Sequence, residues 1–144
     1  MEKIIIDGNN LIVGRMATFV AKNAILGKSV EVVNCENCVF SGSKESVLEK
    51  YRTKLHRGIP AKGPFFYRRP DMFVRRCIRG MITYKKGRGK IAYSNIKCHI
   101  GVPEVFKNEK IQTLENADYT KNPSKRTVDY IKVSLICKLL GWRG

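Results

Sequence analysis

The amino-acid sequence predicts an α/β protein in which helices pack on a small, mainly parallel sheet of four strands. Short β-branched runs alternate along the chain with segments whose apolar residues recur at helical spacing. Clusters of turn-forming residues separate them, as expected of strands that are connected through helices. A length of 144 residues and a hydrophobic content of 43% suit one domain with a buried core.

The first third of the chain contains three of the predicted strands. Lys3–Asp7 is an apolar strand that runs into a turn-forming Gly-Asn-Asn sequence, and a helix follows from Gly14 until Gly27 ends it. A second strand is predicted at Ser29–Cys35 and a short third strand at Val39-Phe40. The link between them is too short for a parallel crossover, so they form either a hairpin or one bent strand.

The middle of the chain contains two predicted helices. Ser43 or Ser46 caps the first of them, which carries Val47, Leu48, Tyr51 and Leu55 on its apolar side. A loop rich in glycine and proline covers residues 58–69. Pro70 suits the first position of the second helix. On this helix, one side is apolar and the opposite side is basic; the apolar residues are Phe73, Val74, Cys77, Ile78 and Met81, and the basic ones are Arg75, Arg76 and Arg79.

The remaining segments complete the predicted fold. Lys85–Lys90 is a basic loop broken by glycines, Ile91–Asn95 is a short helical turn, and Lys97–Val102 is a last strand that Pro103 stops. Beyond it the composition becomes polar, which predicts an extended arm and then a helix at Thr127–Leu140 that ends at Gly141. We therefore expect a core at residues 1–103, which includes the basic stretch 54–90, followed within the same domain by a polar arm and C-terminal helix at residues 104–144.

The charge pattern predicts a polyanionic partner. The chain has a net charge of +16, and the segment Lys54–Lys90 holds twelve lysines and arginines against one acid, Asp71. Folding alone gives no reason to gather so many like charges, whereas RNA phosphates neutralise them and release counterions. Arginine outnumbers lysine in this segment by seven to five, and its forked donors suit phosphate contacts. A membrane surface is disfavoured, because it requires an amphipathic helix with aromatic anchors and the single tryptophan, Trp142, lies at the far carboxyl end.

We predict RNA contacts from the basic segment and from two residues outside it. Phe66 or Tyr67 either stacks on an unpaired base or packs beneath the loop. The candidate contacts are Arg15, Lys44, Lys54, His56, Arg57, Lys62, Arg68, Arg69, Arg75, Arg76, Arg79, Lys85, Lys86, Arg88 and Lys90.

Two motifs leave other function classes open. Gly8–Arg15 joins a strand to a helix as a phosphate loop does, but it lacks the glycine spacing of the dinucleotide fingerprint and the lysine of a P-loop, so a tight turn is the simpler interpretation. Cys35-x-x-Cys38 is a single CxxC pair, whereas a structural zinc site needs four ligands. Buried cysteines are therefore expected, with no metal and no cofactor. His56 and His99 are the only histidines and form no catalytic pattern with the few acids, so no catalytic residue is predicted.

Cysteine usage and the amino terminus indicate a cytoplasmic protein. An odd number of cysteines, five, is typical of reduced thiols. The first residues are too short and too acidic for a signal peptide, and no apolar stretch is long enough to cross a membrane.

Several separated motifs resemble the universal large-ribosomal-subunit protein thirteen family. The resemblance covers about the first hundred residues, and the carboxyl-terminal Leu139-Leu140-Gly141-Trp142 is similar to the archaeal branch. Thr83 and Cys35 depart from the family pattern, which often has proline and alanine there. The matching motifs are Ile6-Asp7-Gly8 with Leu11, Gly14-Arg15 with Ala17, Gly27-Lys28, Val32-Val33-Asn34, Ser41-Gly42-x-Lys44, Tyr51, His56-Arg57-Gly58, Arg69-Pro70, Arg79-Gly80-Met81 and Ile96–Gly101.

The resemblance implies a three-layer α/β/α core that binds large-subunit ribosomal RNA and helps to assemble the subunit. We expect the carboxyl-terminal arm and helix to contact neighbouring ribosomal proteins or RNA. It implies no enzymatic activity and no small-molecule substrate. An α/β enzyme that binds a nucleotide at Gly8–Arg15 is the rival hypothesis, and a zinc module is the third.

Overall fold

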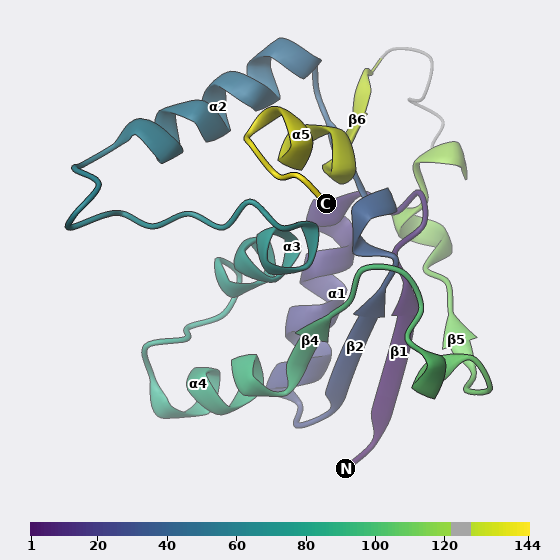
Figure 1. Cartoon of the computed structure of the whole chain (residues 1–144). Coiled ribbons are helices and arrows are strands. Elements are labelled where there is room, and N and C mark those ends of the chain that lie inside the picture. The colour runs from purple at the N-terminus through teal and green to yellow at the C-terminus, as the bar shows by residue number, and fades with distance from the viewer. Residues whose placement is uncertain (122–127) are drawn as a thin grey trace.

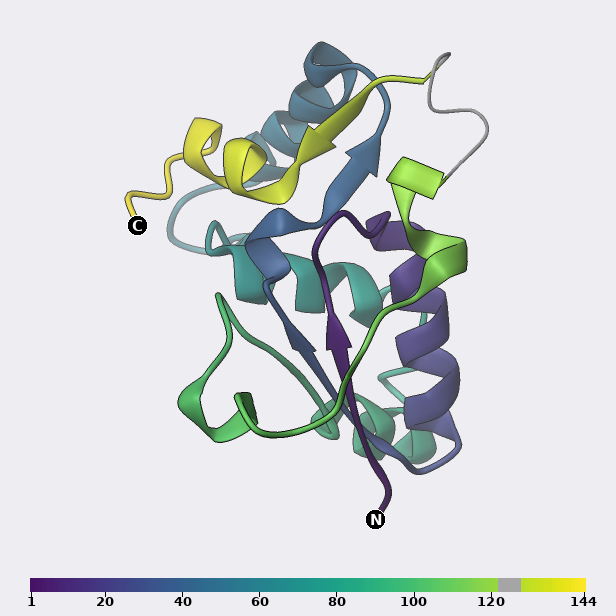
Figure 2. The same cartoon turned by 90° about the vertical axis from the view of Figure 1, so that its right-hand side faces the viewer.

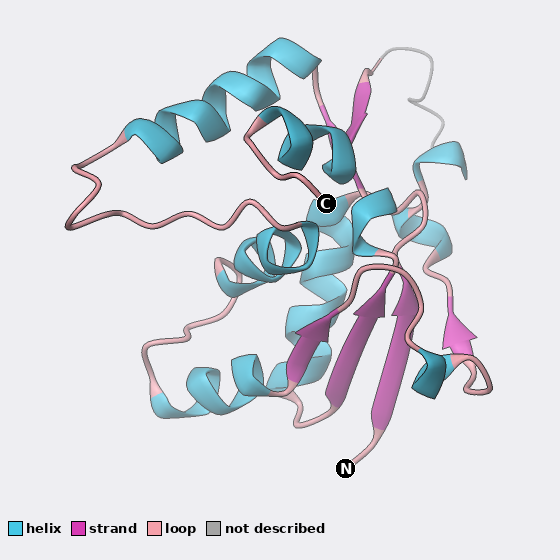
Figure 3. Ribbon diagram, viewed as in Figure 1, coloured by secondary structure: helices cyan, strands magenta, loops and turns pink. Residues whose placement is uncertain are grey.

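The protein is built on a four-stranded parallel sheet, seen in a computed structural model that describes residues 1–121 and 128–144 (Figures 1 and 3). The strand order is β4-β2-β1-β5, and neighbouring strands run parallel throughout. The α/β class and the four-stranded, mainly parallel sheet are confirmed. The strands are β1 (Lys3–Asp7), β2 (Ser29–Val33), β4 (Ile96–Cys98) and β5 (Ile111–Gln112).

The third strand in sequence, β3 (Val39–Ser41), does not belong to this sheet. It pairs antiparallel with β6 (Tyr130–Lys132) in a separate two-stranded sheet, where Phe40 lies opposite Ile131. The predictions of a hairpin and of one bent strand are therefore both wrong. Asn34 adopts a left-handed conformation with φ of 54°, and a 3₁₀ helix, η1 (Cys35–Asn37), then redirects the chain away from β2.

The residues predicted to form an arm supply β5 to the main sheet. Ile5 of β1 is in register with Ile111, so β5 covers the outer edge of β1. The predicted strand Lys97–Val102 begins one residue earlier, at Ile96, and ends at Cys98.

Five α-helices are seen in the described part of the chain, and two differ from the prediction. Lys85–Lys90 is not a loop, because helix α4 starts inside it; Gly89 is buried there, and a Cβ at this position would overlap the Thr83 carbonyl group. This glycine lets the helix approach the preceding turn instead of breaking it. The last helix is much shorter than predicted, since β6 occupies its first half and Thr127 lies outside the described residues. The helices are α1 (Val13–Ile25), α2 (Lys44–His56), α3 (Pro70–Arg79), α4 (Gly87–Ser94) and α5 (Val133–Leu139).

The local start and stop signals agree with the sequence pattern at three helices. Gly27 follows α1 with a φ of +93°, Pro70 is the first residue of α3, and the Ser43 side chain accepts a hydrogen bond from the Ser46 amide at the start of α2. Ser43 is therefore the cap. Met81, predicted on the apolar side of α3, follows the helix end and is half exposed. No helix in residues 1–121 or 128–144 is both long and apolar enough to span a bilayer.

The two faces of the main sheet are covered differently. Ile4 and Ile6 of β1 point into the main core with α1 and α3, whereas Ile5 packs on the other face with Val33 and Phe106. Phe106 belongs to the 3₁₀ helix η2 (Glu104–Phe106), so the third layer is thin, as the edge-on view of Figure 2 shows.

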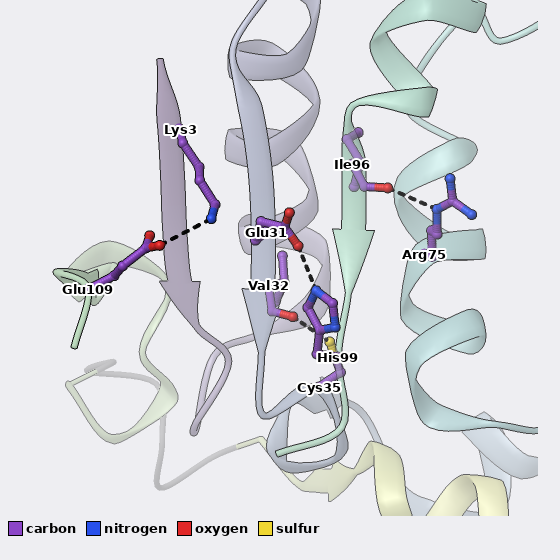
Figure 4. Close-up of polar contacts among 8 residues, drawn as sticks. All are labelled: Lys3, Glu31, Val32, Cys35, Arg75, Ile96, His99 and Glu109. Carbon is purple, nitrogen blue, oxygen red and sulfur yellow. Dashed lines mark hydrogen bonds and ion pairs between the residues drawn. The ribbon is translucent and has the colours of Figure 1, made fainter. Parts of the chain in front are cut away.

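Polar contacts close this second face (Figure 4). The buried Glu31 carboxylate lies 2.6 Å from His99 Nε2, and Lys3 pairs with Glu109 at 3.4 Å. Lys3 Nζ also lies 4.3 Å from the centroid of the Phe106 ring. Three charged side chains of this face, Lys3, Glu31 and Glu109, thus have partners within the protein.

Candidate nucleic-acid interface

The basic segment occupies one side of the molecule, opposite β5. Figure 1 shows α2, the loop of residues 57–69, α3 and α4 along this side. We call the exposed surface of residues 54–90 the basic surface. Of the six ion pairs among the described residues, one lies within it, between Arg69 and Asp71 at 2.9 Å. The charge of this surface is therefore largely uncompensated by the protein itself.

The tip of the loop is held by backbone contacts. The amides of Lys62 and Gly63 both donate to the Ile59 carbonyl, at 3.1 and 2.9 Å. Gly58 has a φ of +76°, and a side chain there would overlap the Gly63 carbonyl, so only glycine permits this close approach. The turn presents Arg57 and Lys62 to solvent.

An aromatic cluster attaches the loop to the core. Phe66 packs against Tyr51 of α2 and Phe73 of α3, with ring centroids 5.9 and 5.8 Å apart, and Tyr51 and Phe73 lie 4.7 Å apart. Burial raises the pKa of Tyr51, whose hydroxyl lies 3.9 Å from Cys77 Sγ. Phe66 thus packs beneath the loop. Phe65 and Tyr67 are 74% and 50% exposed, so their rings are available to a partner.

A groove lies between the loop, the start of α1 and the end of α3. Its volume is about 560 Å³. Lys54, Arg57, Arg76 and Arg79 line it, together with apolar and aromatic side chains, and no aspartate or glutamate is among the described residues that line it. The groove therefore combines positive charge with apolar surface.

Two of the groove cations are held by aromatic rings. The Arg79 guanidinium lies 4.4 Å from the Tyr84 ring centroid, and Lys54 Nζ lies 5.0 Å from that of Tyr51. Such contacts orient the cation and leave its hydrogen-bond donors free. The guanidinium groups of Arg57 and Arg76 form no hydrogen bond or ion pair with residues 1–121 or 128–144.

Arg75 is placed differently from its neighbour Arg76. Its Nε donates to the Ile96 carbonyl at 3.0 Å (Figure 4), its Nη2 donates to the Tyr93 carbonyl at 3.4 Å, and its guanidinium lies 4.4 Å from the Tyr93 ring centroid. Consecutive helical residues are about 100° apart, so Arg75 and Arg76 lie at the two edges of the basic side of α3 and face different neighbours. Arg75 joins α3 to β4, whereas Arg76 and Arg79 line the groove.

The other predicted contacts surround this groove or lie apart from it. His56, Arg57 and Arg68 line a hollow under the loop, and Lys44 lines another hollow along α2. Lys85, Lys86, Arg88 and Lys90 are exposed at the start of α4, where Arg88 donates to the Ile25 carbonyl at 3.3 Å. Arg15 points elsewhere, because its Nη1 donates to the Asn116 carbonyl at 3.0 Å.

Sequence reasoning missed two exposed cations of α2. Lys50 shares a hollow with Lys54 and Arg57, and Arg52 lines the hollow that contains Lys44 and His56. The spacing of Lys50, Lys54 and Arg57 by four and three residues would have placed them on one helix face.

The turn at Gly8–Arg15 is filled by the protein's own contacts. The amides of residues 8–12 all donate within the chain: Gly8 to the Val33 carbonyl at 2.8 Å, Asn9 to an Asp7 carboxylate oxygen at 3.1 Å, and the next three to other carbonyls. A phosphate loop needs such amides free to bind its ligand. This geometry favours the tight turn over the nucleotide loop.

The CxxC pair lies in the core. Cys35 and Cys38 are fully buried, and burial raises the pKa of Cys38 well above its usual value. Within the part of the chain that the structure describes, no three histidine, cysteine or acidic residues are arranged to hold a metal ion. The pair contributes to packing.

A small parallel α/β core with an uncompensated cationic surface defines a class of basic proteins suited to nucleic acid. The comparisons with known proteins identify the family within this class. A model of the family described as Ribosomal protein L13 matches residues 1–105. The chain belongs to the ribosomal protein L13 family.

Relatives over nearly the whole chain agree with this assignment. The chain is 37% identical to the large ribosomal subunit protein uL13 of Methanococcoides burtonii, over 95% of this chain and 96% of the relative. It is 40% identical to that of Methanosarcina barkeri, over 90% and 94%. The identity to the Methanococcus maripaludis protein is 38%, over 96% and 97%.

Proposed function

We propose that this protein is a structural constituent of the large ribosomal subunit in the cytoplasm, where it binds ribosomal RNA through the basic surface and supports subunit assembly. Family membership supports the assignment to the subunit. The observation that carries the binding site is the single ion pair among the twelve cations of residues 54–90. Charges that the fold leaves unneutralised are available to phosphates.

The positions of the cations in the fold suggest different roles for them in the proposed RNA contact. The groove cations Lys54, Arg57, Arg76 and Arg79 form its centre. Lys62 at the loop tip and the exposed cations at the start of α4 extend it on either side. Arg75 acts as a positioning residue that holds α3 against β4. The proposal includes no catalytic step, no cofactor and no metal.

We also propose that α5 contacts a neighbouring ribosomal protein. Leu135 and Leu139 lie one turn apart and are 41% and 39% exposed, so α5 presents two neighbouring apolar side chains to solvent.

The test is binding to large-subunit ribosomal RNA fragments at several salt concentrations. The variant Arg57→Gln/Arg76→Gln/Arg79→Gln removes three cations from the basic surface. A matched control, Lys3→Gln/Lys28→Gln/Lys107→Gln, removes the same charge from positions that are ion-paired in the structure.

We expect the groove variant to flatten the slope of log affinity against log salt by about two to three, and the control to leave it nearly unchanged. Equal effects of the two variants on every fragment would show that the attraction is generic charge and would contradict the proposed surface.

A further inference from the structure

We propose that the groove between the loop, α1 and α3 holds one unstacked nucleotide of the bound RNA, with its base on the apolar floor and its phosphate on Arg57 and Arg76. This inference rests on the proposed function, because it names the part of the RNA that the centre of the basic surface recognises.

The two kinds of surface in the groove fit the two parts of a nucleotide. Its apolar floor includes the accessible side chains of Phe66 and Met81, and its cations are Lys54, Arg57, Arg76 and Arg79. A paired helix buries its base faces and offers only phosphates and groove edges, so it would leave such a floor uncovered. An unstacked nucleotide presents a flat apolar face and an anion together. The volume of about 560 Å³ lies within the range of small-ligand sites.

Two planar groups can hold the base. Phe65 is 74% exposed although it borders the groove, and its ring is backed by Gly63, since a Cβ there would lie 3.2 Å from ring carbons. Arg79 stacks on Tyr84 at 4.4 Å, which leaves the other face of its guanidinium plane for a base.

The wall formed by α1 is open because of a glycine. Gly14 lines the groove, and a Cβ built on it meets no heavy atom within 4 Å. A longer side chain at this exposed helical position would therefore project into free space without strain, which allows the groove to be blocked without changing its charge.

The experiment compares two pools of RNA hairpins with randomised stems, identical except that one carries a single bulged nucleotide. Wild-type protein should bind the bulged pool about tenfold more tightly than the paired pool, from the contribution of one stacked base. Gly14→Met and Phe65→Ala should each abolish this preference, so that either variant binds the two pools equally. Tyr67→Ala, which removes a half-exposed aromatic ring of the same loop outside the groove lining, should keep the preference.

A second readout uses 2-aminopurine as the bulged base. Its fluorescence should be quenched on binding to wild type and to Tyr67→Ala, but not to Gly14→Met. Equal affinity of wild type for both pools would overturn the nucleotide site while leaving the basic surface intact. Loss of salt-dependent binding to ribosomal RNA fragments would instead overturn the proposed function. Saturable binding of micromolar AMP together with equal affinity for the two RNA pools would show that the groove takes a free nucleotide and not RNA.

Discussion

The sheet side of the molecule and the basic surface differ in how many of their cations form ion pairs with carboxylates. On the side of β1, β5 and η2, three cations have carboxylate partners: Lys3 reaches Glu109, Lys28 lies 3.0 Å from Glu2, and Lys107 pairs with Glu104. Eleven of the twelve acids lie outside residues 54–90. On the basic surface one cation, Arg69, has a carboxylate partner within the described residues. This difference indicates that the basic surface, and not the sheet side, requires an anionic partner to neutralise its charge.

The two sides also differ in what holds them together. The sheet side is joined by strand pairing, whereas α2 and the loop of residues 57–69 depend on the aromatic cluster of Tyr51, Phe66 and Phe73. The stability of the basic surface therefore depends on the packing of these three aromatic rings.

Removing Phe73 should have the largest effect on this comparison. Phe73 is fully buried at the centre of the cluster, so Phe73→Ala should lower the free energy of unfolding by about 3–5 kcal/mol, measured by urea denaturation. It should also weaken RNA binding, because α2 and the loop lose their common anchor. Tyr67→Ala, at an exposed ring of the same loop, should change stability by no more than about 0.5 kcal/mol. A loss below about 1 kcal/mol for Phe73→Ala would contradict this account.

Substitutions of the neighbours Arg75 and Arg76 should have different effects: one should lower the stability of the fold, and the other should weaken RNA binding. Arg75→Gln leaves two carbonyls without their charged donor, so the free energy of unfolding should fall by about 1–3 kcal/mol with little change in the salt slope of RNA binding. Arg76→Gln should do the reverse: unfolding should change by at most about 0.5 kcal/mol, and the slope should flatten by about one. Similar profiles for the two variants would remove the distinction between positioning and contact residues.

The smallest expected effects are the changes in the free energy of unfolding when a single lysine is neutralised on each side of the molecule. Lys86 is exposed at the start of α4, beside like charges and the positive end of the helix dipole, so Lys86→Gln should raise the free energy of unfolding by a few tenths of a kcal/mol at low salt. Lys28→Gln loses an ion pair and should lower it by about 0.5 kcal/mol. Both differences should shrink at about 1 M salt. A stabilising effect of Lys28→Gln would contradict the conclusion that ion pairs stabilise the sheet side of the molecule.

Elements with a local signal could be predicted from the sequence. β1, α1 and α3 have clear periodicity and end signals, and they form where expected. β5 and β6 have two and three residues, too few for a period to be visible. They exist because partners distant in the chain pair with them, as Val39 does with Lys132.

The same limit applies to the binding surface. Local composition was enough to locate the basic segment and to select its cations. It could not show that Arg75 bonds to Ile96 while Arg76 stays free, because those partners are set by tertiary packing. Nor could it show the groove, whose walls come from α1, α3 and the loop together. RNA contact by each of these residues stays a prediction.

The late strands have a consequence for how the protein is made. A nascent chain leaves the ribosome from its amino end, so β3 and its basic neighbour segment emerge well before β6. At ordinary rates of synthesis, the interval between residues 41 and 132 is roughly 5 to 20 s. Once residue 90 is made, all twelve cations are present while β1 still lacks β5 and β3 still lacks β6. Unpaired strand edges beside clustered cations favour aggregation, so we expect the nascent chain to be shielded by a partner until β6 is made.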